Sequence, residues 1–169
     1  MVKIPSFNEK NLYIKISSDL EEMKKPGNPG DIFIYNLIND LQFDALKNEE
    51  RDNLVVFHSG FTPNDKKKIF EEVLLEFGKT SVGKEKKLIL RAGPILQASL
   101  DISTNTMWTQ ETCPEDLLQR IGRCNRWGYL EESCFTIVKH KRNEKNDSVE
   151  NSGQKKYLKN GYCLKTTLA

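Results

Sequence analysis

Short apolar runs alternate along the chain with amphipathic stretches. Continuous apolar runs bounded by polar or turn-forming residues predict buried strands, whereas apolar residues repeated every three or four positions predict helices. Strands are therefore expected at residues 31–37, 53–59, 86–93, 105–110 and 133–140. Helices are expected at residues 38–50, at residues 63–79 and from residue 114 onward. The alternation predicts an α/β layer fold with a largely parallel sheet, in which ligands generally bind at the carboxyl ends of the strands.

The length of 169 residues favours one ordinary domain with a sizeable core. We place the core of this domain at residues 31–140, after an N-terminal segment at residues 1–30. Residues 141–160 are almost free of apolar side chains and are expected to form a long mobile loop or tail. They belong to a last segment, residues 141–169, whose "GYCLKTTL" either adds a strand or frays.

Composition excludes some classes of protein. No apolar run approaches the roughly 20 residues that span a bilayer, and the start "MVKIPSFNEK" lacks the apolar region of a signal peptide, so a cytoplasmic location is expected. The formal net charge of +2 means that binding to nucleic acid would depend on local clusters of charge. The four cysteines form no CxxC pair and are expected to be reduced and structural.

The segment "PEDLLQRIGRCNRWG", residues 114–128, predicts a helix with two different faces. Pro114 suits a first helical position, and the two acids that follow it are favourable in a first turn. Successive residues are about 100° apart around a helix. One face then carries Leu117, Ile121 and Cys124, and the opposite face carries Gln119, Arg123 and Arg126.

Two interpretations of the arginine face remain open: a solvated basic surface or an anion site. Charged runs usually face water, which favours the first. Gly122 would cost about 1 kcal/mol inside a helix, which favours close approach of another group to the backbone. All three cations are arginines although lysine is abundant elsewhere, and the planar guanidinium matches phosphate.

No complete hydrolytic site is visible in the sequence. "GKTS" at residues 78–81 resembles the end of a phosphate-binding loop, but Val73 stands where that loop needs its first glycine. "DLEE" at residues 19–22 is interpreted as surface. No pair of acids is placed to hold magnesium, and neither His58 nor His140 has an evident nucleophile or metal partner. We therefore predict no metal site.

Four segments, in order, resemble one helicase family. "LLQRIGRCNRWG" matches the QRxGRxxR pattern of the sixth motif of superfamily 2 helicases, and "ILQASLDIS" (95–103) resembles the fifth motif of the CRISPR-associated helicase-nuclease of type I systems. "VVFHSGFTPNDKKKIFEE" (55–72) is similar to the fourth motif of that family, and "DIFIYNLINDLQ" (31–42) to the segment that opens the same domain. The resemblance implies the second RecA-like domain of that helicase, with a three-layer fold.

The resemblance also implies a nucleotide site. In this family ATP and magnesium lie between two RecA-like domains, of which the second supplies arginine fingers. Arg123 and Arg126 would then reach the γ-phosphate and stabilise charge in the transition state. Gln119 would position the attacking water or the phosphate, Asp101 would link the nucleotide to the DNA-binding side, and Arg120 would tie the motif to its own domain.

Single-stranded DNA is the second ligand that the resemblance implies. His58 and Ser59 belong to the fourth motif, which lies close to the DNA strand, and Ser99 would lie near the phosphate backbone. Lys66, at the start of a helix, is either a phosphate contact or part of a solvated helix end. We expect Trp127 to pack against the domain rather than stack on bases.

Three hypotheses for function follow. The chain is an isolated second RecA-like domain that completes an ATP site with a separate first domain. Alternatively, it is a catalytically inactive module that regulates, scaffolds or inhibits the CRISPR effector complex, as a helicase mimic or anti-CRISPR protein would. Gly93, Pro94 and Gln97 replace family residues of the fifth motif, which favours this second hypothesis. The third hypothesis is that the chain is a decayed remnant of a gene and has no function. No ATPase activity is expected for the chain alone, because it has no phosphate loop and no magnesium ligands.

Overall fold

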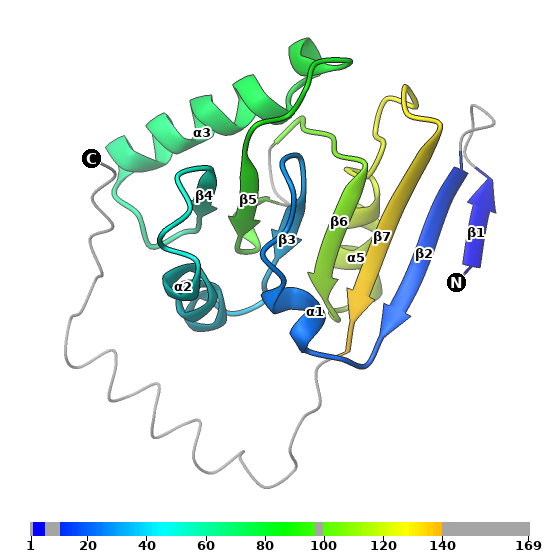
Figure 1. Ribbon diagram of the computed structural model, residues 1–169, viewed down its shortest axis with the longest axis horizontal. Helices are drawn as coiled ribbons and strands as arrows, with labels where there is room; N and C mark the ends of the chain where they lie inside the picture. Colours follow the sequence, from blue (N-terminus) through cyan, green and yellow to red (C-terminus); the bar gives the residue numbers. More distant parts are fainter. Residues whose placement is uncertain (1, 6–10, 97–99, 140–169) are drawn as a thin grey trace, which may run out of the picture.

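The computed structural model describes residues 2–5, 11–96 and 100–139. They form a seven-stranded sheet in the order β1-β2-β7-β6-β3-β5-β4 (Figure 1). The strands are β1 Val2–Pro5, β2 Asn11–Ser17, β3 Ile32–Ile34, β4 Leu54–Phe57, β5 Ile89–Ala92, β6 Thr106–Gln110 and β7 Glu132–Val138. Only β1 is antiparallel to its neighbour, β2, and the other neighbouring strands pair in parallel. The predicted α/β fold with a largely parallel sheet is confirmed.

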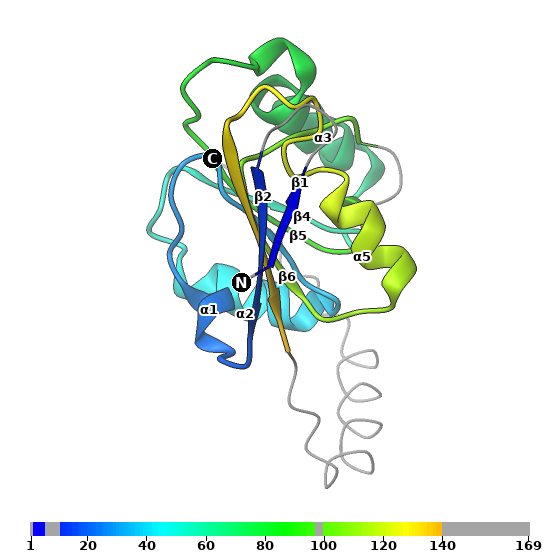
Figure 2. The ribbon, with the colours of Figure 1, turned by 90° about the vertical axis from the view of Figure 1, so that its right-hand side faces the viewer.

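Helices cover both faces of the sheet. They are α1 Glu21–Lys24, α2 Ile38–Lys47, α3 Pro63–Phe77, the 3-10 helix η1 Lys79–Ser81 and α5 Pro114–Ile121. Seen along the sheet in Figure 2, α1 and α2 lie on one side and α3 and α5 on the other. The result is a three-layer α/β arrangement.

Two apolar cores fill the spaces between these layers, and β3 contributes to both. Ile32 and Ile34 belong to the core that contains the buried residues of α3, whereas Phe33 belongs to the core that contains Met23 of α1 and Leu41 of α2. Successive side chains of a strand point to opposite faces of a sheet. A strand buried on both faces therefore needs an unbroken apolar run, which is the pattern that predicted it.

The predicted helices are confirmed, with earlier ends. The hydroxyl of Thr62 accepts the backbone N–H of Asp65 at 3.3 Å and caps the start of α3, which ends at Phe77, before Gly78. The helix predicted from residue 114 ends at Ile121. Residues beyond it do not follow a helical projection, which changes the expected position of two arginines.

The N-terminal segment contributes strands that the sequence pattern was not used to predict. β2 pairs in parallel with β7 along its whole length, from Asn11 opposite Glu132 to Ser17 opposite Val138. Leu12 and Ile14 pack against the larger core. The segment predicted as a mobile tail, residues 141–160, and "GYCLKTTL" lie outside the described residues. Among the helices of the described part, none is long and apolar enough to cross a membrane.

Candidate functional site

The loop that follows α5, residues 122–128, is held against the segment that leads into β6. The N–H of Thr104 donates to the carbonyl of Arg123 at 3.1 Å, and the N–H of Asn125 donates to the carbonyl of Thr104 at 2.7 Å. Asn125 adopts a φ of 52°, a left-handed conformation that asparagine tolerates better than most residues. Thr104 precedes the first residue of β6. This arginine loop therefore lies where the parallel strands begin, which we call the amino edge of the sheet; the carboxyl edge is where these strands end.

Arg126 of this loop forms an ion pair with Asp101, which lies in the segment before β6. The Nε of Arg126 lies 2.6 Å from Oδ1 of Asp101, and the two side chains are 39% and 62% exposed. The backbone N–H of Arg126 donates to the hydroxyl of Ser103 at 2.9 Å. Two residues predicted to serve the nucleotide are therefore adjacent and accessible. Ser103 was not among the predicted site residues, although it is the last residue of the segment that resembles the fifth motif, residues 95–103.

Arg123 is buried, contrary to the helical projection that placed it on an exposed face with Gln119. Only 8% of Arg123 is exposed, and its Nη1 donates to the carbonyl of Gln119 at 2.5 Å. Burial, and then the charge of Arg126, lowers the pKa of Arg123, while Asp101 opposes this shift. The helix ends at Ile121, so Arg123 folds back over its last turn. Gln119 itself is exposed.

Arg120 is a structural arginine. It is 1% exposed, and its Nη1 donates to the hydroxyl of Thr109 at 2.5 Å and to the carbonyl of Gln110 at 3.2 Å. Both acceptors belong to β6, so Arg120 ties α5 to the sheet, as expected. Burial lowers the pKa of Arg120, and Asp116 partly offsets this effect.

Gly122 does not lie inside a helix. The predicted cost of about 1 kcal/mol for a glycine in a helix interior therefore does not apply to it. It is the C-cap of α5, with φ −61° and ψ −3°. A Cβ at this position would lie 3.4 Å from the carbonyl oxygen of Leu118 and 3.6 Å from that of Gln119, which are ordinary contacts. Gly122 is therefore no sign of a group that approaches the backbone.

The residues predicted to contact DNA lie at the other edge of the sheet, after the carboxyl end of β4. His58 is 5% exposed, stacks on Phe61 with ring centroids 4.2 Å apart, and accepts the N–H of Gly60 at Nδ1 at 3.0 Å. Burial, and then the charge of Lys66, lowers the pKa of His58. Ser59 is exposed and Lys66 half-buried. Ser99 lies outside the described residues.

An apolar groove with a basic rim lies beside these residues. It has a volume of about 370 Å³ and is lined by Phe57, Pro63, Lys66, Lys67, Phe70, Ile95 and Leu100. The groove brings the start of α3 together with the region that follows β5. The structure thus forms two separate groups: the arginines with Asp101 and Gln119, and His58 with Ser59 and Lys66.

A buried ion pair that sequence reasoning missed supports the scaffold. Arg91 of β5 is fully buried and pairs with Asp44 of α2. Its guanidinium also donates to the carbonyl of Met23 at 3.0 Å and to the hydroxyl of Tyr35 at 2.6 Å. The pair therefore joins the N-terminal segment to the sheet and to α2. In the part of the chain that the structure describes, no three His, Cys, Asp or Glu residues form a group that could hold a metal ion.

Comparison with known proteins gives consistent similarities. The family model "CRISPR-associated nuclease/helicase Cas3, C-terminal" matches residues 32–128, more than half of the chain. The CRISPR-associated endonuclease/helicase Cas3 of Escherichia coli (strain K12) is 36% identical over 117 residues, which are 63% of this chain and 13% of that protein. The chain thus spans a small part of that relative.

Solved structures share the fold. The crystal structure of T. fusca Cas3 with AMPPNP matches with a TM-score of 0.67 at 18% identity, over 85% of this chain and 20% of that one. A CRISPR RNA-guided surveillance complex in a pre-nicking state matches with a TM-score of 0.62 at 20% identity, over 80% of this chain and 19% of that chain. The C-terminal domain of the DEAD-box protein Dbp5 matches with a TM-score of 0.50 at 15% identity, over 89% and 86%.

Proposed function

The chain belongs to the family of Cas3 C-terminal domains, and on that premise we propose that it acts as the second RecA-like domain of a type I CRISPR-associated DNA helicase. Its core would comprise residues 31–140. It would supply arginine fingers to an ATP site that a separate first RecA-like domain completes with its phosphate-binding loop and magnesium.

The position of Arg126 is the observation that carries this proposal. Its side chain is 39% exposed, and the ion pair with Asp101 and the N–H bond to Ser103 fix its loop. A cation held in place before the reaction stabilises developing phosphate charge without costly reorganisation. Arg126 is therefore the finger that is already accessible to a first RecA-like domain, whereas Arg123 is buried.

Arg123 and Gln119 have different parts in this proposal. Gln119 is exposed on the last turn of α5 and would contact the phosphate or the attacking water. Arg123 donates to the carbonyl of Gln119 and is 8% exposed, so its side chain must rotate away from the helix to reach a phosphate. Closure of the two domains would bring the phosphate of ATP close to Arg123, where it would compete with the carbonyl of Gln119 for the guanidinium.

The DNA-binding surface is proposed at the carboxyl edge of β4. Ser59 is exposed there, and Lys66 and Lys67 are among the residues that line the apolar groove. Lysines beside apolar surface suit a single strand, whose phosphates and bases need both. His58 is buried, so it would not contact DNA itself. It would support this surface through its stack on Phe61 and through the N–H of Gly60, which donates to its Nδ1.

Reconstitution of the ATP site tests the proposal. The purified chain is titrated into a first RecA-like Cas3 domain, and magnesium-dependent ATP hydrolysis is measured. Stimulation is expected, with a loss of roughly a hundredfold or more for Arg126→Ala, because fingers contribute several orders of magnitude. Arg51→Ala, a change of the same type in the loop between α2 and β4, serves as the matched control. The chain alone should not hydrolyse ATP, and turnover by it that Arg126→Ala abolishes would contradict the proposal.

A binding module without catalysis is the second candidate function. The observation in its favour is the loop after β5, where Gly93 stands in the place of a threonine of the fifth motif. A Cβ at Gly93 would lie 3.6 Å from Cβ of His58, an ordinary contact, so the backbone at this position has room for a Cβ. In the titration this candidate predicts binding to the first domain, or to the CRISPR effector complex, without stimulated hydrolysis.

A further inference from the structure

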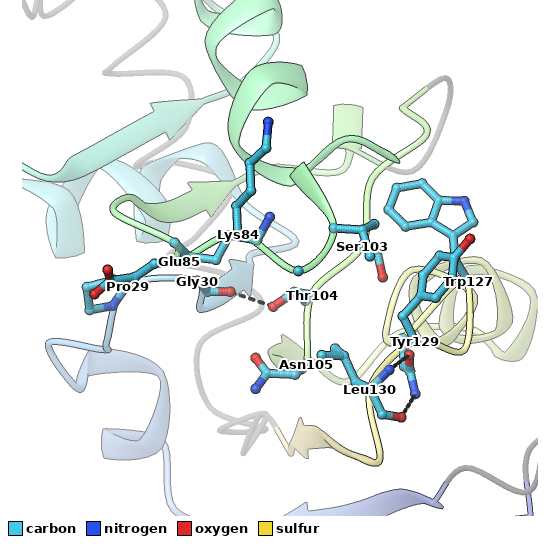
Figure 3. A pocket seen from close by; sticks show the side chains of 14 residues that line it. Pro29, Gly30, Lys84, Glu85, Ser103, Thr104, Asn105, Trp127, Tyr129 and Leu130 are labelled. Atoms are coloured by element: carbon cyan, nitrogen blue, oxygen red, sulfur yellow. Dashed lines mark hydrogen bonds between the residues drawn. The ribbon is translucent and has the colours of Figure 1, made fainter. Parts of the chain in front are cut away.

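A cleft of about 610 Å³ lies beside the arginine loop (Figure 3), and neither proposed site above uses it. Trp127, Tyr129 and Leu130 stand on one side of this cleft, and Pro29, Gly30, Lys84 and Glu85 stand on the other. Residues 103–105 lie between the two sides. The cleft is at the amino edge of the sheet, across the molecule from the proposed DNA surface.

Hydrogen bonds fix both sides of the cleft. The side chain of Asn125 donates to the carbonyl of Leu130 at 2.8 Å and accepts the N–H of Leu130 at 3.1 Å, which closes the loop that carries both aromatic residues. Opposite it, the hydroxyl of Thr104 donates to the carbonyl of Gly30 at 2.5 Å. A cleft whose walls are already ordered loses little conformational freedom on binding.

Two aromatic rings are available in the cleft. Tyr129 is 59% exposed, and Trp127, which was predicted to pack against the domain, is only half-buried and lines the cleft. Within the described residues, the stacked ring pairs are Phe33 with Trp108 and His58 with Phe61, so neither cleft ring belongs to one. A large exposed aromatic ring costs solvation free energy, and stacking against a planar ligand removes that cost.

The rest of the lining is polar and partly basic. Ser103 and the exposed Asn105 present hydroxyl and amide groups. Lys84 and Glu85 are exposed on the opposite side. The ammonium of Lys86 donates to the carbonyl of Glu76 and to Ser81, so Lys84 is the cation with the greater freedom to meet a ligand. An apolar ligand would leave these polar groups without partners.

We propose that this cleft binds a nucleobase with its attached phosphate, the base stacked on Trp127 or Tyr129 and the phosphate near Lys84. Asn105 has the donor and acceptor groups that an exposed base edge requires. The chemistry is shared by a unit of single-stranded DNA and a free nucleotide. The proposal does not depend on ATP hydrolysis or on a first helicase domain.

Tryptophan fluorescence of the whole chain tests this proposal. Trp127 lines the cleft, whereas Trp108 is not among its lining residues and stacks on Phe33, so quenching by a ligand in the cleft reports mainly Trp127. One titration uses a short oligothymidylate and the other thymidine 5′-monophosphate, with binding of a labelled oligonucleotide measured in parallel. If the oligonucleotide quenches the fluorescence at a much lower concentration than the mononucleotide does, the cleft is a site for single-stranded DNA. If both ligands quench at the same concentration, the cleft is a site for a free nucleotide.

Matched variants separate this cleft from the proposed DNA surface. Tyr129→Ala and Trp127→Ala should each weaken binding by roughly tenfold, whereas Trp127→Phe, which keeps a stacking ring, should bind nearly as the unchanged chain does. Lys84→Gln should weaken binding more than Lys47→Gln on α2, and Leu118→Ala should have no effect. Absence of quenching by both ligands would overturn the proposal, as would binding that Lys66→Gln removes while the cleft variants leave it intact.

Discussion

The guanidinium of Arg126 lies 2.6 Å from the carboxylate of Asp101, and this ion pair joins the loop after α5 to the segment before β6. Both side chains are substantially exposed, at 39% and 62%, so water and salt screen their attraction. The pair therefore positions Arg126 more than it stabilises the fold.

Neutralising this pair should hardly change stability. Asp101→Asn and Arg126→Ala are each expected to lower the free energy of unfolding by less than about 1 kcal/mol, because exposed ion pairs contribute little. Urea titrations of both variants and of the double variant measure the coupling, which should shrink as salt is added. A loss of several kcal/mol from either change would mean that the pair is structural.

Arg120 should behave in the opposite way. Arg120→Ala removes hydrogen bonds to Thr109 and Gln110 from a buried site, and we expect a loss of about 2–4 kcal/mol in the free energy of unfolding. The same urea titration measures it, with Arg126→Ala as the matched control at the surface. Equal stability of the two variants would refute the structural assignment of Arg120.

Stability should fall as His58 gains a proton. Its pKa is lowered in the folded chain, so below its ordinary value of 6.5 the unfolded chain binds protons more readily than the folded one. The free energy of unfolding should therefore decrease as the pH falls below 6.5 toward the lowered pKa. His58→Gln should reduce this dependence, measured by urea titrations at about pH 8 and about pH 5, on either side of the ordinary pKa. An identical slope in the variant would show that other groups cause it.

Two cysteines should differ sharply in reactivity. Burial raises the pKa of the Cys124 thiol to about 12, against the opposing hydrogen bond to Ser133, whereas Cys113 is exposed at the start of α5. Since the thiolate is the nucleophile, brief treatment of the native chain with iodoacetamide should modify Cys113 before Cys124. Mass spectrometry of the peptides measures both rates. Similar rates would indicate that the loop after α5 opens often.

The regular elements could be predicted because each carries a local signal. The apolar period of α3 and the unbroken run of β3 depend only on which side chains are buried. β2 carries such a signal too, since Leu12 and Ile14 alternate with polar residues, but a segment so far from β7 in sequence gives no local hint of its partner.

The site was less predictable because its geometry depends on where a helix ends. The motif identifies Gln119, Arg123 and Arg126, but a helical projection holds only as far as Ile121. Beyond that residue, the side chain of Arg123 turns back onto α5 and Arg126 pairs with Asp101. The segment before β6 holds the loop in this path, because the N–H of Thr104 donates to the carbonyl of Arg123. Arg91 is a similar case, because its burial requires Asp44 and Tyr35 from distant elements.

Helix α3 runs without interruption from the carboxyl edge of the sheet to its amino edge. It begins beside Lys66 at the proposed DNA surface, and the carbonyl of its last residue, Phe77, accepts the N–H of Ser103 at 2.8 Å. Fifteen residues of α-helix extend roughly 22 Å. A continuous helix bends little over this length. A DNA strand that tilted the first turn of α3 would therefore also displace Ser103, whose hydroxyl accepts the backbone N–H of Arg126. One helix and two hydrogen bonds therefore connect the surface proposed for DNA with the loop that carries the arginine proposed for ATP.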